Sequence, residues 1–180
     1  TYPFSTPNQV TKYDVIDEVP ARAMVIFAHP DDAEIGAGAT AALWAGQGCE
    51  ITYVQCTTGS SGSNDTEMTS ERIVAIRAAE QRAAADAIGV GDIVVLDHPD
   101  GELEADRVLL GEVVHALRKY RPEVVCTHDQ HRINGFQHRD HRHVGISVHD
   151  AVYPYARDHL HFPEHLGDGI EPHKVKHLLY

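Results

Sequence analysis

Cysteines and long apolar stretches are both scarce in this chain of 180 residues. Its three cysteines, Cys49, Cys56 and Cys126, show no C-x-x-C spacing, and their odd number argues against a disulfide scaffold. We therefore expect a reduced, cytoplasmic protein. The apolar runs fall well short of the roughly 20 residues that span a bilayer, and no basic segment followed by an apolar one begins the sequence. We expect no membrane attachment, although a chain that begins at Thr1 without methionine leaves the loss of a leader open.

Basic residues are also few. Twenty-seven acidic residues stand against fifteen basic ones, which gives a formal net charge of -12. Such a surface repels nucleic acids and anionic membranes, so neither is an expected partner. An uncharged or cationic small molecule is easier to accommodate. The sequence carries no signature of oligomeric state, so a homo-oligomer stays open.

Hydrophobic residues make up 42% of the chain, which is enough for one packed core at this length. We expect a single catalytic domain over residues 1–180, with an irregular arm at residues 1–20 that contains three prolines. Fourteen histidines are present, and they crowd into the second half of the chain. A local excess of histidine suggests metal chemistry without proving it.

Short β-branched or apolar runs alternate with longer alanine-rich or amphipathic segments after position 20. This alternation predicts an α/β fold: a Rossmann-like, mainly parallel sheet with helices on both faces. Ligands of such sheets bind beyond the carboxyl ends of the strands. The expected strands cover residues 23–28, 50–57, 92–97, 123–128 and 174–180, and the expected helices cover 36–48, 70–89, 107–120 and 141–156.

The segment "FAHPDDAEIG" follows the first expected strand and places two carboxylates side by side. An ordinary turn with a helix N-cap would explain Pro30 and one aspartate. It would not explain His29 or the presence of both Asp31 and Asp32. Since His29 and Asp32 stand three residues apart at the entry of a helix, they could grip one ion.

A second cluster, "HRDH", lies in the loop that follows the fourth expected strand. A solvated, charged helix start is the simpler explanation of this cluster alone. Taken with the first segment, however, His141 supplies a third ligand, and three protein ligands with an open position are typical of catalytic zinc. We therefore predict zinc on His29, Asp32 and His141, with Asp31 as the general base toward the metal-bound water.

Together the two clusters resemble the signature of the LmbE-like zinc N-deacetylases, the PIG-L family, with Arg139 where proline is frequent. Further similar segments are "RAAE" (77–80), "HPDGEL" (98–103) and "DGIEPHKVKHLLY" near the end, so the resemblance runs from about residue 22 onward. It implies the same ligands and base. It also implies that His138, as an imidazolium, stabilises the oxyanion, and that Asp140 orients a neighbouring histidine. An N-cap role for Asp140 is the alternative.

The resemblance further implies that Arg77 and Asp100 contact the substrate. An i,i+3 ion pair with Glu80 would also explain Arg77, and turn chemistry in "PDG" would also explain Asp100. Phe136 stands where some relatives carry a tyrosine near the reaction centre. The remaining histidines of this region have no assigned role: His128, His131, His143 and His149.

The implied function is a zinc-dependent hydrolase that removes the acetyl group from an N-acetylglucosamine-type conjugate. A metal-dependent phosphoesterase would need two ions and a cationic phosphate clamp, for which the sequence offers no second ligand set. A nucleotide-binding module built on "GAGA" (36–39) fails the G-x-G-x-x-G spacing. A non-catalytic metal-binding protein is the remaining alternative. Because family members generally continue further, we expect the C-terminal part of the family fold, with part of the substrate pocket, to lie beyond position 180.

Overall fold

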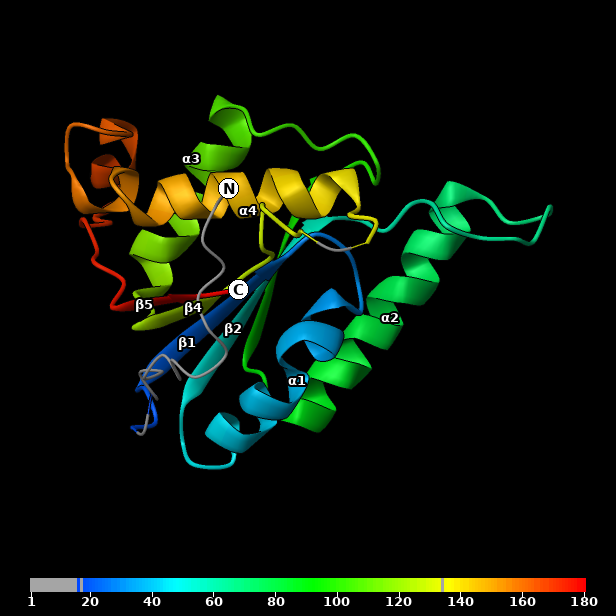
Figure 1. The fold of residues 1–180 in the computed structure, drawn as a ribbon, viewed down its shortest axis with the longest axis horizontal. Coiled ribbons are helices and arrows are strands. Elements are labelled where there is room, and N and C mark those ends of the chain that lie inside the picture. Colours follow the sequence, from blue (N-terminus) through cyan, green and yellow to red (C-terminus); the bar gives the residue numbers. More distant parts are fainter. Residues whose placement is uncertain (1–15, 17, 134) are drawn as a thin grey trace, which may run out of the picture.

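The protein alternates strands and helices from residue 22 onward (Figure 1). In the computed structural model the described residues are 16, 18–133 and 135–180, so most of the expected irregular arm at residues 1–20 lies outside them. The strands are β1 (Arg22–Phe27), β2 (Glu50–Thr57), β3 (Asp92–His98), β4 (Val124–Cys126) and β5 (His177–Leu179). The helices are α1 (Asp32–Ala45), α2 (Ser70–Ile88), α3 (Arg107–Tyr120) and α4 (Arg139–Val152), followed by the short 3-10 helices η1 (Tyr155–Arg157) and η2 (Pro163–Asp168).

The five strands form one sheet in the order β3-β2-β1-β4-β5, and each of its strand pairs is parallel. The expected α/β fold with a parallel sheet is thereby confirmed. The chain moves outward from β1 to β3 and then returns to the other side of β1 with β4, so the strand order reverses between β1 and β4. Such a reversal leaves a crevice at the carboxyl ends of the two strands, where α/β proteins bind ligands.

Helices cover both faces of the sheet, and this explains why β1 is apolar at every position after Arg22. Met24 and Ile26 point into the core formed with α3 and α4, whereas Val25 and Phe27 point into the core formed with α1 and α2. Figure 1 shows the two helix pairs on opposite sides of the strands. A strand buried on both sides cannot alternate apolar with polar residues. It therefore holds the loop that follows it on a rigid, central support.

Helix boundaries agree with the capping residues. The helix expected over 70–89 ends within one residue of that range, because the Thr69 hydroxyl accepts a hydrogen bond from the Arg72 amide and Gly89 adopts a left-handed conformation. The helix expected from position 36 begins four residues earlier, at Asp32. The helix expected over 141–156 begins at Arg139 and ends at Val152, before a proline. The second motif is thus part of the first turn of α4.

The two final expected strands are shorter than expected, with three residues each in β4 and β5. None of the described helices is long and apolar enough to cross a membrane.

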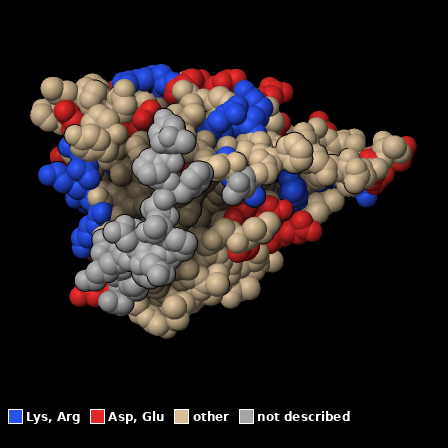
Figure 2. All heavy atoms as spheres, viewed as in Figure 1, with Lys and Arg blue, Asp and Glu red and all other residues tan. Residues whose placement is uncertain are grey.

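The loop between β2 and α2 projects from the body of the molecule, and acidic side chains lie at its tip (Figure 2). Elsewhere on the face shown, Lys and Arg and also Asp and Glu form small separate groups (Figure 2).

Candidate metal and catalytic site

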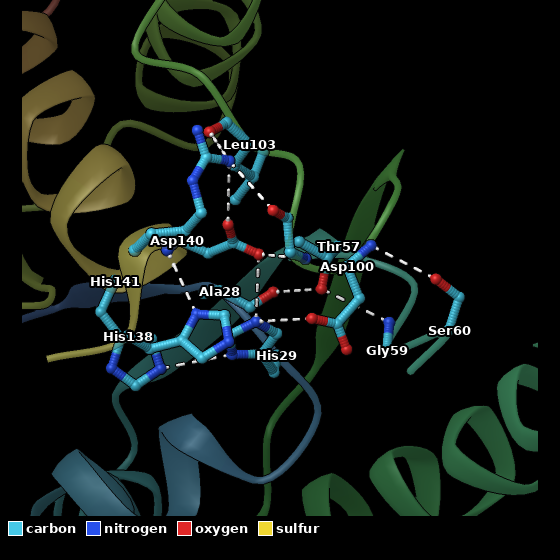
Figure 3. A network of polar contacts seen from close by, with 12 residues as sticks. Ala28, His29, Thr57, Gly59, Ser60, Asp100, Leu103, His138, Asp140 and His141 are labelled. Atoms are coloured by element: carbon cyan, nitrogen blue, oxygen red, sulfur yellow. Dashed lines mark hydrogen bonds and ion pairs between the residues drawn. The ribbon is translucent and has the colours of Figure 1, made fainter. Parts of the chain in front are cut away.

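All eight residues that the sequence singled out lie around the crevice between β1 and β4. Figure 3 shows the histidines and two of the aspartates pointing toward one another from different elements. The loop after β1 and the first turns of α1 and α4 supply most of them, while the loop after β3 and helix α2 supply one each. The eight residues are His29, Asp31, Asp32, Arg77, Asp100, His138, Asp140 and His141.

Three side chains place one ligand atom each at the corners of a small triangle. His29 Nδ1 lies 3.2 Å from Asp32 Oδ2 and 3.2 Å from His141 Nε2, and His141 Nε2 lies 3.1 Å from Asp32 Oδ2. Zinc–ligand bonds of 2.0–2.1 Å in a tetrahedron require ligand atoms about 3.3 Å apart. The observed triangle therefore fits the three protein ligands of one tetrahedral ion.

Other overlapping groups of His and Asp in the described chain are also close enough to share an ion. These groups differ from the triangle in the hydrogen bonds that their ring nitrogens make. His128 Nε2 accepts a hydrogen bond from the Ala28 amide at 3.1 Å, and His138 Nδ1 accepts one from the Asp140 amide at 3.2 Å. Both lone pairs are therefore engaged, whereas no backbone amide of the described residues donates to His29 Nδ1. The groups are His29, His138 and His141; His29, Asp100, His138 and Asp140; and Asp32, His128 and His141.

Asp32 is ionised in this environment. Burial opposes its charge, but the adjacent rings of His128, His141 and His29 outweigh burial and hold the pKa of Asp32 well below its ordinary value. The same oxygen, Oδ2, accepts the His29 backbone amide at 2.8 Å. One carboxylate oxygen thus organises both the loop after β1 and the facing imidazoles.

His29 uses its two ring nitrogens for different partners. Nδ1 faces the triangle, while Nε2 lies 3.2 Å from Asp100 Oδ1 and 3.2 Å from Asp140 Oδ2. Donation from Nε2–H to these carboxylates leaves Nδ1 unprotonated, the arrangement usual for a metal-bound histidine. Asp140 is fully buried, and its Oδ2 also accepts the Gly101 amide at 2.7 Å. Burial lowers the pKa of His29, but the neighbouring carboxylates more than reverse this and raise it.

His138, and not Asp140, is the N-cap of α4, because its Nδ1 accepts the Asp140 amide. Asp140 instead lies in the first turn and contacts His29. Partial removal of the His138 ring from water, followed by the charge on His29, lowers the pKa of His138. These contacts do not agree with the imidazolium expected at His138. They favour a neutral ring that carries its proton on Nε2.

Asp31 differs from Asp32 in side-chain exposure and in the direction of its pKa shift, and its backbone conformation is unusual. Its backbone is left-handed (φ 90°), a conformation that costs a non-glycine residue about 1–3 kcal/mol, and as N-cap of α1 it makes no side-chain capping bond. The side chain is 61% exposed and lines a cavity of about 240 Å³. Burial and then the charge of Asp32 raise the pKa of Asp31, and Arg77 opposes them only in part. Adjacent carboxylates with opposite shifts are typical of a divided acid–base role.

Arg77 reaches the site from α2. Its guanidinium lies 3.7 Å from Asp31 Oδ2 and 4.0 Å from Asp100 Oδ2, so its ion pairs among the described residues cross between elements instead of joining Glu80 on the same helix. Gly59 permits this approach, since a Cβ there would lie 2.9 Å from Arg77 Nη1. The Asp100 side chain is only 9% exposed and faces His29, which favours a supporting position over a direct substrate contact.

His128 belongs to the site, although the sequence left it unassigned. Its ring stacks on His141 with centroids 3.9 Å apart and planes 8° apart, and its Nε2 lies 3.4 Å from Asp32 Oδ2. Gly145 allows α4 to approach closely, because a Cβ there would lie 2.5 Å from the His128 carbonyl oxygen. One signal was available: His128 ends the strand expected over 123–128, and the structure places that strand, β4, beside β1, which precedes His29. Adjacent parallel strands bring such positions together.

Replacing His128 by phenylalanine is expected to weaken zinc binding about 10- to 100-fold, the usual effect of removing a group that orients a metal ligand. Phenylalanine retains a ring against His141 but cannot accept the Ala28 amide or contact Asp32. Competition titration with a chromophoric chelator measures the affinity. His131→Phe, on the exposed part of the same loop, is the matched control. Equal affinities in the two variants would show that His128 does not support the ligand set.

The chain is similar to known proteins in both sequence and structure. The PIG-L family model, described as GlcNAc-PI de-N-acetylase, matches residues 24–152. Diacetylchitobiose deacetylase of Thermococcus kodakarensis is 31% identical over 86% of this chain and 57% of its own length. Mycothiol S-conjugate amidase of Streptomyces coelicolor is 30% identical over 86% of this chain and 59% of its own. The chain thus spans less than two thirds of these relatives.

Among solved structures, N,N'-diacetylchitobiose deacetylase from Pyrococcus horikoshii, in complex with its inhibitor MPG, superposes with a TM-score of 0.82 and 29% identity. The superposition covers 86% of this chain and 57% of that one. The range matched by the family model takes in well over half of the chain and contains both the "HPDD" and the "HRDH" segments. The chain therefore belongs to the PIG-L (LmbE-like) family, as its motifs predicted.

Proposed function

We propose that this protein is a zinc-dependent hydrolase that removes the acetyl group from an N-acetylglucosamine-type conjugate. One observation carries the proposal. The ligand atoms of His29, Asp32 and His141 have the spacing of a tetrahedral metal site, and a second carboxylate, Asp31, lies beside them without being one of the three ligands. The names of the relatives support the substrate class, since diacetylchitobiose and a mycothiol S-conjugate are the substrates that they state. A third relative is called a deacetylase of an inositol acetamido-deoxyglucopyranoside.

The proposed division of labour follows from the contacts. His29, Asp32 and His141 would hold zinc, which lowers the pKa of water toward about 7 and polarises a carbonyl oxygen. Asp31 accepts a proton from the attacking water as the water oxygen bonds to the acetamide carbon. His138 donates its Nε2–H to the carbonyl oxygen as negative charge develops there. The C–N bond then breaks, and the proton held by Asp31 passes to the departing amine.

Asp140 and Arg77 act around these groups. Asp140, fully buried against His29 Nε2, keeps the ring in the tautomer that leaves Nδ1 free. The Arg77 side chain is 25% exposed beside Asp31, so its guanidinium is in reach of sugar hydroxyls in the adjoining cavity. Asp100 joins Arg77 to His29, and we assign it to holding both groups in place.

The alternatives fit the contacts less well. A phosphoesterase needs free cations for the phosphate, but Arg77 lies against Asp31 and Asp100, and Arg139 donates to the carbonyls of Gly101 and Leu103. The neutral acetamide of an amino sugar has no such requirement. A protein that only stores metal has no use for an exposed, strained carboxylate next to the ligand triangle.

The test is release of free amine from N,N'-diacetylchitobiose by the zinc-loaded protein. We expect turnover to disappear after chelation and to return with one equivalent of zinc per chain. p-Nitrophenyl phosphate serves as the phosphoesterase arm, and we expect no hydrolysis of it. Phosphate release without amine release would replace the proposal with the phosphoesterase, and zinc binding without either activity would leave a metal-binding protein.

A further inference from the structure

Asp31 has a backbone conformation that its position at the start of α1 does not explain. An aspartate at an N-cap usually has extended backbone, and its carboxylate accepts a backbone amide of the first turn. Asp31 is left-handed instead (φ 90°, ψ -28°), and its carboxylate makes no capping bond. Something outside α1 must therefore keep this residue from relaxing into an ordinary cap.

Gln81 on α2 is in contact with that residue. Its Oε1 accepts the Asp31 backbone amide at 2.9 Å, and its Nε2 donates to Glu34 Oε1, also at 2.9 Å. Gln81 is 4% exposed and is one of only two buried residues of α2. One amide group thus joins α2 both to the strained N-cap and to the first turn of α1.

We propose that Gln81 is a positioning residue for Asp31, an inference that rests on the proposed function. By accepting the Asp31 amide, Gln81 holds the left-handed conformation and so keeps the carboxylate off the helix terminus and beside Arg77. Without this hydrogen bond, Asp31 relaxes toward an ordinary N-cap, and its carboxylate turns to the amides of α1. A base displaced by about 1 Å can lose on the order of 100-fold in rate.

The Asp31 amide and the Glu34 carboxylate together specify which side chain is needed at position 81. An acceptor is needed for the Asp31 amide, and a donor is needed for the Glu34 carboxylate, so glutamine suits both. Leucine offers neither. Glutamate keeps the acceptor but places a second carboxylate against Glu34. Exchanging the two residues, Gln81→Glu with Glu34→Gln, restores one acceptor and one donor in the same positions.

Four variants test the inference in the zinc-loaded protein: Gln81→Leu, Gln81→Glu, the double exchange with Glu34→Gln, and Gln47→Leu as an exposed control. For Gln81→Leu we expect kcat to fall about 10- to 100-fold with KM and zinc content nearly unchanged. The kcat of Gln81→Glu falls by a similar factor, and that of the double variant recovers to within about threefold of wild type. The kcat of the control equals that of wild type. A role in packing alone would not be rescued by the exchange.

Hydrogen exchange of the Asp31 amide gives a readout that does not depend on activity. We expect hydrogen exchange at this amide to be faster in Gln81→Leu and to be slow again in the double variant Gln81→Glu with Glu34→Gln. The inference would be overturned if Gln81→Leu left the hydrogen-exchange rate unchanged, left kcat unchanged in an active protein, or only raised KM. A wild-type protein that releases no amine would refute the proposed function instead, and the exchange measurement would still decide whether Gln81 holds Asp31.

Discussion

Asn in place of Asp31 is expected to lower kcat by about two to four orders of magnitude, the usual contribution of a general base, while zinc stays bound. Asparagine has nearly the same shape as aspartate but cannot accept the proton of the attacking water. Asp32, and not Asp31, supplies the carboxylate oxygen of the ligand triangle. Steady-state kinetics on diacetylchitobiose and metal analysis of the same preparation measure both effects.

The matched control for this variant is Asp150→Asn. Asp150 is an exposed aspartate on α4, and its replacement makes the same change of charge away from the crevice. We expect its kcat to equal that of wild type. If Asp31→Asn kept full turnover, another group would be the base. If it lost zinc, Asp31 would be a ligand and the division between the two adjacent aspartates would be wrong.

Alanine in place of Asp32 is expected to reduce zinc affinity by more than about 100-fold, beyond the effect of losing a merely supporting group, and to abolish turnover. Asp32 Oδ2 is the common partner of His29, His128 and His141, so its removal takes away both a ligand atom and the negative charge between three imidazoles. Competition titration measures the affinity. The metal-free protein also loses the acceptor of the His29 amide, which costs about 1–3 kcal/mol of folding free energy.

Asp32→Asn separates these two consequences. Asparagine can still accept the His29 amide, so thermal unfolding of its metal-free form should lie closer to wild type than that of Asp32→Ala. Zinc affinity should stay low in both variants, since a neutral amide is a poor ligand beside two imidazoles. One tightly bound zinc in Asp32→Ala would contradict the triangle and point to the neighbouring group of His29, His138 and His141.

Agreement between sequence and structure is closest where a local pattern has one physical solution. The doubly buried part of β1 after Arg22 must be apolar, and α2 must begin near Thr69 and end near Gly89. The expectation of a loop around positions 29–32 and of a helix from 36 places the start of α1 four residues too late. In the folded chain α1 begins already at Asp32, and Gly38 lies buried inside the helix.

The sequence by itself determined the α/β fold and placed His29, Asp32 and His141 in segments that follow two expected strands, at the carboxyl-end edge of the sheet. Only the tertiary structure decided which face each side chain presents. It showed that His128 stacks on His141, that His138 caps α4 through Nδ1, and that Gln81 reaches the Asp31 amide. The physical reason is that periodicity specifies which residues a helix or strand buries. Contacts between elements depend on sheet order and on the rotation of each helix against the sheet, and no local pattern encodes either.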